Sequence, residues 1–119
     1  MPRFVILEHD HPVMHWDLML EAGPVLRTWR LAVPPCPREP IAATAVFDHR
    51  LLYLDYEGPI SGGRGRVVRW DHGTLTGQVT DGGPILVHLR GQRLCGILRL
   101  EHLEGDAWCG SMEPSEPEP

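Results

Sequence analysis

The sequence predicts an all-β fold, a small antiparallel β-barrel formed by a single domain. The 13 glycines and 12 prolines fall at short intervals between apolar runs, which is the spacing of turns between strands. The apolar runs are short and alternate with polar residues, and no long window keeps the 3.6-residue period of an amphipathic helix. Because 42% of the 119 residues are hydrophobic, the chain can build one core but not two.

The strands are expected in the following order. Three open the chain, at residues 3–8, 15–21 and 25–31. A Gly23-Pro24 turn joins the last two, and four prolines predict a surface loop at residues 34–40. Six further strands are expected at residues 42–47, 51–56, 65–70, 73–79, 84–89 and 94–100. Hairpin turns are predicted at Asp71–Gly73 and Arg90–Gln92. About nine short strands in one small domain favour a closed or nearly closed barrel or sandwich, which hides the strand edges.

The charge is concentrated in a short C-terminal segment. We expect the barrel domain to span residues 1–112 and a disordered Pro/Glu tail to span residues 113–119. The formal net charge is −5, but the body has 11 arginines against 13 acidic residues, a net charge of −2. Broad electrostatic capture of nucleic acid is therefore excluded, and any polyanion has to be bound by a local site.

The cysteine pattern and the apolar runs bear on the compartment. The three cysteines are odd in number, far apart and without a CxxC pair, which argues against a disulfide framework or a cysteine zinc site. No apolar run approaches the about 18 residues of a membrane span, and no charged, apolar and small-residue leader follows Met1. We therefore expect a cytoplasmic protein with no membrane partner.

The densest group of chemically active residues lies between Glu8 and Asp17. Side chains alternate along a strand, so His15 and Asp17 are predicted to point the same way. Pro12 ends the preceding strand, so the chain can turn and bring His9 beside His15. Two imidazoles and one carboxylate on one face can hold a metal ion and leave positions open. The alternative is a pair of solvated histidines at a turn, with Asp17 in a local cap.

A second group follows a predicted strand. His49 is expected on the barrel rim, and Tyr53, four residues later, could offer its hydroxyl to the same pocket. The alternatives are a lone surface histidine and an ordinary cross-strand aromatic.

A glycine-rich stretch supplies local positive charge. Arg64 and Arg66 lie in it, and no acidic residue falls between Gly58 and Trp70. Glycines let backbone N–H groups approach an oxyanion, so a phosphate-binding loop is one interpretation of this stretch. The pattern alone favours a solvated turn, because no helix N-terminus follows the loop.

Several motifs together resemble a known family. They are Arg3–Val5 with Glu8–Asp10, then His15–Glu21, Leu26–Trp29, Asp48–Tyr53, Tyr56–Ile60 and Trp70–Thr74. In these motifs the sequence is similar to the 3′-phosphoesterase domain, the N-terminal module of bacterial DNA ligase D. The resemblance runs from Arg3 to about Leu100. His9, His15 and Asp17, followed by His49 and Tyr53, match the family in order and spacing.

The resemblance implies a small β-barrel whose pocket binds one divalent metal ion, most often manganese, with zinc, cobalt or another transition metal as alternatives. It also implies removal of a 3′-terminal phosphate or ribonucleoside from the 3′ end of DNA or RNA during repair, alongside separate ligase or polymerase proteins. His9, His15 and Asp17 would be the metal ligands. His49 and Tyr53 would contact the phosphate, and Asp10 would orient an imidazole.

Three positions depart from the family's usual residues. Met19 and Ile41 stand where the family usually has arginines, and Phe47 stands where it usually has a glutamate. Because a phosphate-binding arginine is missing at Met19, we predict that Arg64 or Arg66 substitutes for it. A non-catalytic metal- and DNA-end-binding module is the alternative function. A ferrous oxygenase site also uses two histidines and a carboxylate, but its usual order places the His-x-Asp pair first.

Overall fold

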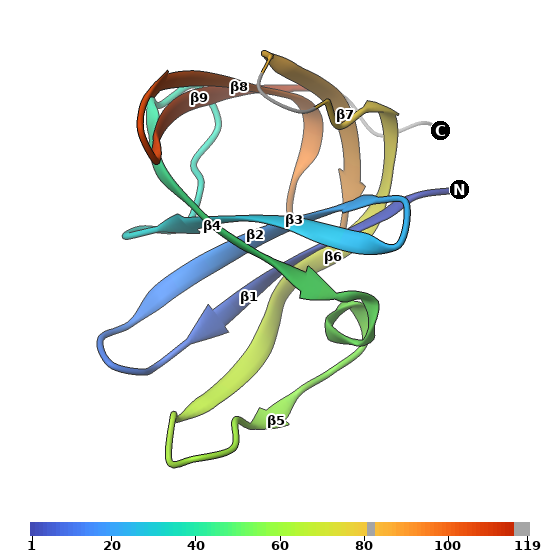
Figure 1. Ribbon diagram of the computed structural model, residues 1–119. Coiled ribbons are helices and arrows are strands. Elements are labelled where there is room, and N and C mark those ends of the chain that lie inside the picture. Colours follow the sequence, from blue (N-terminus) through green and yellow to red (C-terminus); the bar gives the residue numbers. More distant parts are fainter. Residues whose placement is uncertain (81–82, 116–119) are drawn as a thin grey trace.

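The strands of the protein close into an antiparallel barrel, seen in a computed structural model that describes residues 1–80 and 83–115 (Figure 1). Eight strands form the ring, in the spatial order β1-β2-β3-β4-β9-β8-β7-β6, and pairing of β6 with β1 closes it. The strands are β1 (Arg3–His9), β2 (His15–Ala22), β3 (Val25–Leu31), β4 (Ile41–Arg50), β6 (Arg66–Gln78), β7 (Ile85–Gly91), β8 (Cys95–Glu104) and β9 (Ala107–Pro114). A two-residue strand, β5 (Gly58–Pro59), pairs with β6. The all-β barrel prediction is confirmed.

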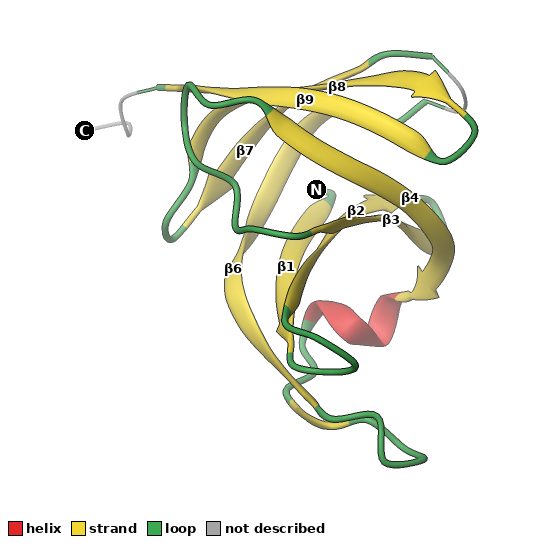
Figure 2. Ribbon diagram, turned by 90° about the vertical axis from the view of Figure 1, so that its left-hand side faces the viewer, coloured by secondary structure: helices red, strands yellow, loops and turns green. Residues whose placement is uncertain are grey.

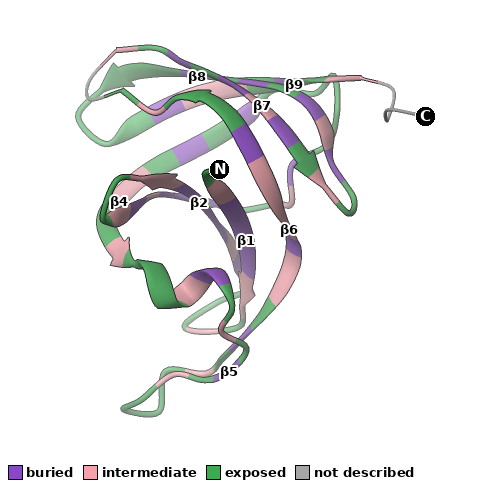
Figure 3. Ribbon diagram, turned by 90° about the vertical axis from the view of Figure 1, so that its right-hand side faces the viewer, coloured by how far each residue is buried: buried purple, intermediate pink, exposed green. Residues whose placement is uncertain are grey.

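The first two strands are buried on both faces, which explains the continuous apolar run near the N-terminus. Phe4, Ile6, Leu18 and Leu20 point into the main core inside the barrel. The alternate residues of β1 and β2 face a smaller cluster, formed by Val5, Leu7, Met19, Leu26, Leu54 and Val67. Figure 3 shows buried residues along β1 and β2, and more exposed ones on η1 and the end of β4. A pocket lies on the side of this smaller cluster.

A short helix replaces the strand predicted at residues 51–56. Leu51–Leu54 form a 3₁₀ turn, η1, next to β1 (Figure 2). This turn buries Leu54 in the smaller cluster and places Asp55 against Arg3, whose Nη2 lies 2.7 Å from Oδ1 of Asp55. The alternating pattern of the segment fits a strand equally well, so contacts with distant residues favour the turn.

The hairpin turn predicted at Asp71–Gly73 is also wrong, because β6 runs straight through it. The pairing of β6 with β1 shifts by one residue between Asp71 and Arg69, so the irregularity is a bulge. A Cβ at Gly73 would overlap the carbonyl of Arg90 on β7, so the glycine permits a close approach of two strands. The second predicted hairpin exists slightly later in the chain, where the Gly91 N–H donates to the Leu94 carbonyl at 2.7 Å.

The C-terminal strand was not predicted. β9 pairs with both β4 and β8 and completes the ring. It continues to Pro114, and the backbone N–H of Ser115 donates to the Cys95 carbonyl at 2.9 Å, so the tail does not start at residue 113. Backbone pairing with β8 keeps these polar residues in the sheet. Residues 116–119 of the predicted tail lie outside the described residues.

The described parts of the chain, 1–80 and 83–115, have no helix with the length and apolar character needed to cross a membrane.

Candidate metal and phosphate site

Three potential ligands meet where β1 ends and β2 begins. His9 and His15 are direct partners in the β1–β2 ladder, and their ring centroids are 4.8 Å apart. One ligand atom from each of His9, His15 and Asp17 lies within 4.8 Å of the others. His15 and Asp17 are buried, and His9 is half-buried. The turn at Pro12 and the strand alternation thus bring together the three residues that the sequence singled out.

Backbone carbonyls orient both imidazoles. Nδ1 of His15 donates to the Val13 carbonyl at 2.9 Å, and Nε2 of His9 donates to the Arg64 carbonyl at 2.7 Å. A carbonyl can only accept, so in a neutral imidazole the other ring nitrogen keeps its lone pair. Nε2 of His15 is buried without a hydrogen-bond partner and lies 3.3 Å from Oδ2 of Asp17. Two oriented nitrogen donors and one carboxylate fit a divalent transition metal ion.

Arg30 is a site residue that the sequence reasoning missed. It lies directly opposite Asp17 in the β2–β3 ladder, and its Nε donates to Oδ1 of Asp17 at 3.4 Å. Its side chain is 44% exposed, so the guanidinium can still reach a ligand. The signal was present in the sequence: a turn at Gly23-Pro24 pairs Ala22 with Val25, and counting back along both strands pairs Asp17 with Arg30.

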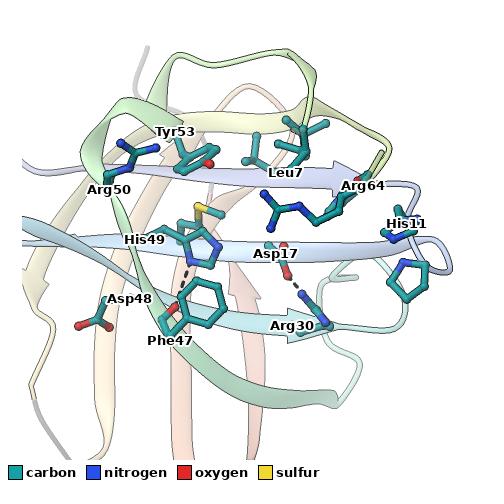
Figure 4. Close-up of a pocket in the computed structure, with 15 residues that line it drawn as sticks. Leu7, His11, Asp17, Arg30, Phe47, Asp48, His49, Arg50, Tyr53 and Arg64 are labelled. Carbon is teal, nitrogen blue, oxygen red and sulfur yellow. Dashed lines mark hydrogen bonds and ion pairs between the residues drawn. The ribbon is translucent and has the colours of Figure 1, made fainter. Parts of the chain in front are cut away.

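The ligand set opens into a pocket of about 360 Å³. Its apolar lining comes from Leu7, Pro12, Met19, Phe47, Ile60 and Val67, and its charged lining from Asp17, Asp48, Arg30, Arg50 and Arg64. Figure 4 shows Tyr53, His49 and Arg64 pointing from different elements into this pocket, near Asp17 and Arg30. Three arginines against two aspartates give the pocket lining a formal charge of +1, which would suit an anion, although the chain as a whole is acidic.

His49 and Tyr53 both line the pocket, and Tyr53 lies on η1 rather than on the predicted strand. Their rings meet edge to face at 5.6 Å. Nδ1 of His49 donates to the Phe47 carbonyl at 3.0 Å, which leaves Nε2 available. Burial lowers the pKa of His49 below its usual value, and the nearby carboxylate of Asp17 partly opposes this shift.

The glycine-rich loop contributes differently from the prediction. Arg64 lines the pocket, and its Nε donates to the Ser61 carbonyl at 2.7 Å. Arg66 is exposed and is not among the pocket residues. The Asp10 carboxylate accepts the backbone N–H of Arg66 at 2.8 Å and does not orient an imidazole, which corrects its predicted role. Asp10 therefore anchors the loop whose Arg64 carbonyl holds His9.

Gly65 makes this anchor possible. Its φ of +75° lies in the region that favours glycine. A Cβ there would also overlap the carboxylate of Asp10 and lie 2.7 Å from the Cβ of His11.

The DNA ligase D 3′-phosphoesterase domain matches this chain over residues 7–102. The chain belongs to this family. Among its relatives are the "Multifunctional non-homologous end joining DNA repair protein LigD" of Mycobacterium tuberculosis, 35% identical over 114 residues, and the "Multifunctional non-homologous end joining protein LigD" of Pseudomonas aeruginosa, 37% identical over 79 residues. The first alignment covers 88% of this chain and 15% of the relative, and the second covers 62% and 9%. The chain thus spans less than a fifth of either relative.

The three positions at which the sequence resemblance implied departures from the family lie in different environments. Met19 is 1% exposed and lines the pocket among apolar neighbours. Ile41 is buried in the main core, away from the pocket lining. Phe47 lines the pocket and is exposed. Met19 and Phe47 therefore change the pocket itself, while Ile41 contributes to the barrel interior.

Proposed function

We propose that this chain is a divalent-metal-dependent phosphoesterase that removes a 3′-terminal phosphate or ribonucleoside at nucleic-acid ends during DNA repair. The observation that carries the proposal is the pair of carbonyl-oriented imidazoles beside Asp17, which open into a pocket with three arginines. Membership of the 3′-phosphoesterase family supports it.

The proposed metal ligands are the free nitrogens of His9 and His15 and the carboxylate of Asp17. Manganese is the ion we expect first, with zinc, cobalt or another transition metal as alternatives. When bound, a divalent ion supplies positive charge that polarises the phosphoryl oxygens. For a 3′-phosphate end, phosphorus gains a bond to the oxygen of water and loses its bond to the 3′ oxygen, which yields inorganic phosphate and a 3′ hydroxyl. For a terminal ribonucleoside, phosphorus gains a bond to the oxygen of water and loses its bond to the 5′ oxygen of that nucleoside, which yields the free nucleoside and a 3′ phosphate.

Phosphate binding falls to the side chains that face the pocket. Arg30 is oriented by Asp17 through Nε, which leaves its terminal nitrogens for a phosphate oxygen. An incoming phosphate favours protonation of His49 on Nε2, so that His49 and the Tyr53 hydroxyl can both donate to it. In this proposal Arg30 and Arg64 bind the phosphate in place of the arginine that is missing at position 19. Arg66 does not bind it.

The choice between these arginines has a direct test. We expect Arg30→Ala and Arg64→Ala each to lower kcat/KM for a 3′-phosphate end, by about 10²-fold if no other group compensates. Arg66→Ala is the matched control. It removes the same charge two residues from Arg64, but Arg66 does not line the pocket. A larger loss in Arg66→Ala than in Arg30→Ala would contradict the assignment.

Catalysis itself is tested by release of inorganic phosphate from a 3′-phosphate primer annealed to a longer template, with manganese and with chelator. We expect manganese-dependent release that is abolished in His15→Ala and kept in His102→Ala, an exposed histidine outside the pocket.

The buried Met19 favours a second candidate, a non-catalytic module that binds a metal and a nucleic-acid end. One metal bound by the wild type, lost in His15→Ala and accompanied by no phosphate release, would select this module over the enzyme.

The proposed binding partner is the 3′ end of DNA or RNA. The relatives that the chain matches are named as multifunctional end-joining proteins, so we also propose separate ligase or polymerase repair proteins as partners. For an activity on DNA ends we propose a cytoplasmic location.

A further inference from the structure

Phe47 differs from every other large aromatic side chain in the protein. Of the eight Phe, Tyr and Trp residues, all of which lie in the described parts of the chain, only Phe47 is exposed, with 76% of its surface accessible. Scattered exposed apolar residues are normal on a protein surface and do not define a site. Phe47 needs a further explanation because it also lines the pocket that holds the proposed metal and phosphate groups.

The ring of Phe47 is held in a defined orientation. It stacks on the imidazole of His49 with ring centroids 4.7 Å apart and planes 13° from parallel (Figure 4). The other ring pairs at the pocket, His49 with Tyr53 and Tyr53 with Tyr56, meet edge to face at 79° and 86°. The flat stack follows from the strand, since residues two apart on β4 point to the same side. One face of Phe47 therefore covers His49, and its large exposed fraction leaves the other face to solvent.

The pocket has the size and the division of chemistry of a site for one nucleotide. Its volume of about 360 Å³ is near the lower end of ligand sites, which begin at about 300 Å³. The arginines and the ligand set offer cationic groups to a phosphate, whereas Phe47 offers an apolar π-face. Nucleobases stack on such faces with little preference for sequence, because every base has a π-face.

We propose that Phe47, backed by His49, is a stacking platform for the base of the 3′-terminal nucleotide. The inference rests on the proposed function and adds to it a subsite that recognises the base. The chain would then bind an end through two separate contacts, one to the phosphate and one to the base. The base contact compensates for part of the affinity that is lost because position 19 is a methionine and not an arginine.

The test compares two 3′-phosphate primers on the same template, one ending in a normal nucleotide and one ending in an abasic tetrahydrofuran nucleotide. We expect Phe47→Ala to raise KM for the normal end by about 10-fold, within the range for loss of one base–aromatic stack. The KM for the abasic end should not change, and kcat should change little for either. Phe47→Leu should behave like Phe47→Ala, and Phe47→Trp should restore the low KM.

A binding measurement makes the test independent of turnover. In the presence of manganese, a primer with 3′-terminal 2-aminopurine and a 3′-phosphate should lose fluorescence on binding to the wild type and to Phe47→Trp, but not to Phe47→Leu. Leu86→Ala is the matched control, because Leu86 is 51% exposed and lies on β7, outside the pocket lining. It should leave both KM and the fluorescence change as in the wild type.

The outcomes separate this inference from the proposed function. Equal KM changes for normal and abasic ends, or quenching that persists in Phe47→Leu, would overturn the platform while phosphate release continued. Absence of release from every variant, with quenching that still depends on an aromatic residue at position 47, would overturn the catalytic proposal and support the platform. A wild type that binds the 2-aminopurine primer without quenching, or does not bind it, would overturn the platform.

Discussion

Asp71 and Asp17 are both buried carboxylates, with 1% and 3% of their surfaces exposed, but their surroundings differ. The oxygens of Asp71 accept four backbone N–H groups at 2.7–3.1 Å, from His72, Gln92, Arg93 and Leu94. Within residues 1–80 and 83–115, the oxygens of Asp17 have only longer contacts, 3.4 Å to Nε of Arg30 and 3.3 Å to Nε2 of His15.

This difference separates a carboxylate with a structural role, Asp71, from Asp17, the carboxylate for which we propose a functional one. Asp71 has its hydrogen-bonding capacity filled by its neighbour His72 and by three N–H groups of the turn between β7 and β8, so its interactions stabilise the fold. Asp17 is incompletely satisfied and lies beside an unpartnered ring nitrogen, which a folded protein tolerates where a ligand supplies the missing interaction. Burial alone would have selected both residues, and only the hydrogen bonds that each carboxylate accepts distinguish them.

The largest expected effect is on the fold, in Asp71→Ala. The substitution leaves four N–H groups without their acceptor, so we expect the free energy of unfolding to fall by about 3 kcal/mol or more. Urea denaturation measures it, and the exposed Asp106→Ala is the control. A loss below about 1 kcal/mol would contradict the structural role assigned to Asp71.

Asp17→Asn should affect metal binding and leave stability nearly unchanged. With chelator present, we expect the free energy of unfolding to change by less than about 1 kcal/mol, because Asp17 interacts with Arg30 and His15 only at long distances. Manganese affinity, measured by calorimetry, should fall by about 100-fold or more, since a neutral amide replaces an anionic ligand. Unchanged manganese affinity would show that Asp17 is not a ligand.

Gly65→Ala tests whether the loop anchored by Asp10 positions His9 for metal binding. Its Cβ would displace Asp10 and with it the loop that carries the Arg64 carbonyl, so we expect manganese affinity to fall by about 10-fold. Gly63→Ala is a matched control, because Gly63 also has a positive φ, +69°, but a Cβ there meets nothing within 4 Å. Both variants should lose about 1 kcal/mol of stability from backbone strain. Equal manganese affinities in the two variants would argue against the anchor.

The smallest effect is expected at an exposed carboxylate, Asp55. The hydrogen bonds from Arg3 hold the pKa of Asp55 below its ordinary value of 3.8, so the ionised form stabilises the folded state. This contribution is present above pH 3.8 and is lost as the pH falls through the lower pKa of the folded state. Asp55→Asn should therefore be slightly less stable than wild type near neutral pH and equal to it in strong acid. Urea denaturation at several pH values measures the difference, and a gap that widens toward acid would have the wrong sign.

Much of the proposed metal site could be predicted from local sequence patterns. His9, His15 and Asp17 follow from one turn at Pro12 and from strand alternation, which depend on the backbone of neighbouring residues. The position of Arg30 beside Asp17 could also have been predicted, because a tight turn determines the register of the two strands it joins. The hydrogen bond of Asp10 could not, since its partner on the Arg66 backbone is 56 residues away.

The sequence by itself determined the strand class, the opening hairpin and the proximity of the three proposed metal ligands, since each depends on patterns within a few neighbouring residues. The tertiary structure decided the rest. Residues 51–54 form η1, β6 continues through the predicted hairpin, and β9 completes the ring. These three outcomes depend on contacts between distant segments. The tertiary structure also decided that Asp71 is saturated while Asp17 is not, and that Phe47 is exposed at the pocket. The hydrogen bonds of a buried carboxylate and the exposure of a ring exist only once the distant strands have packed around each residue.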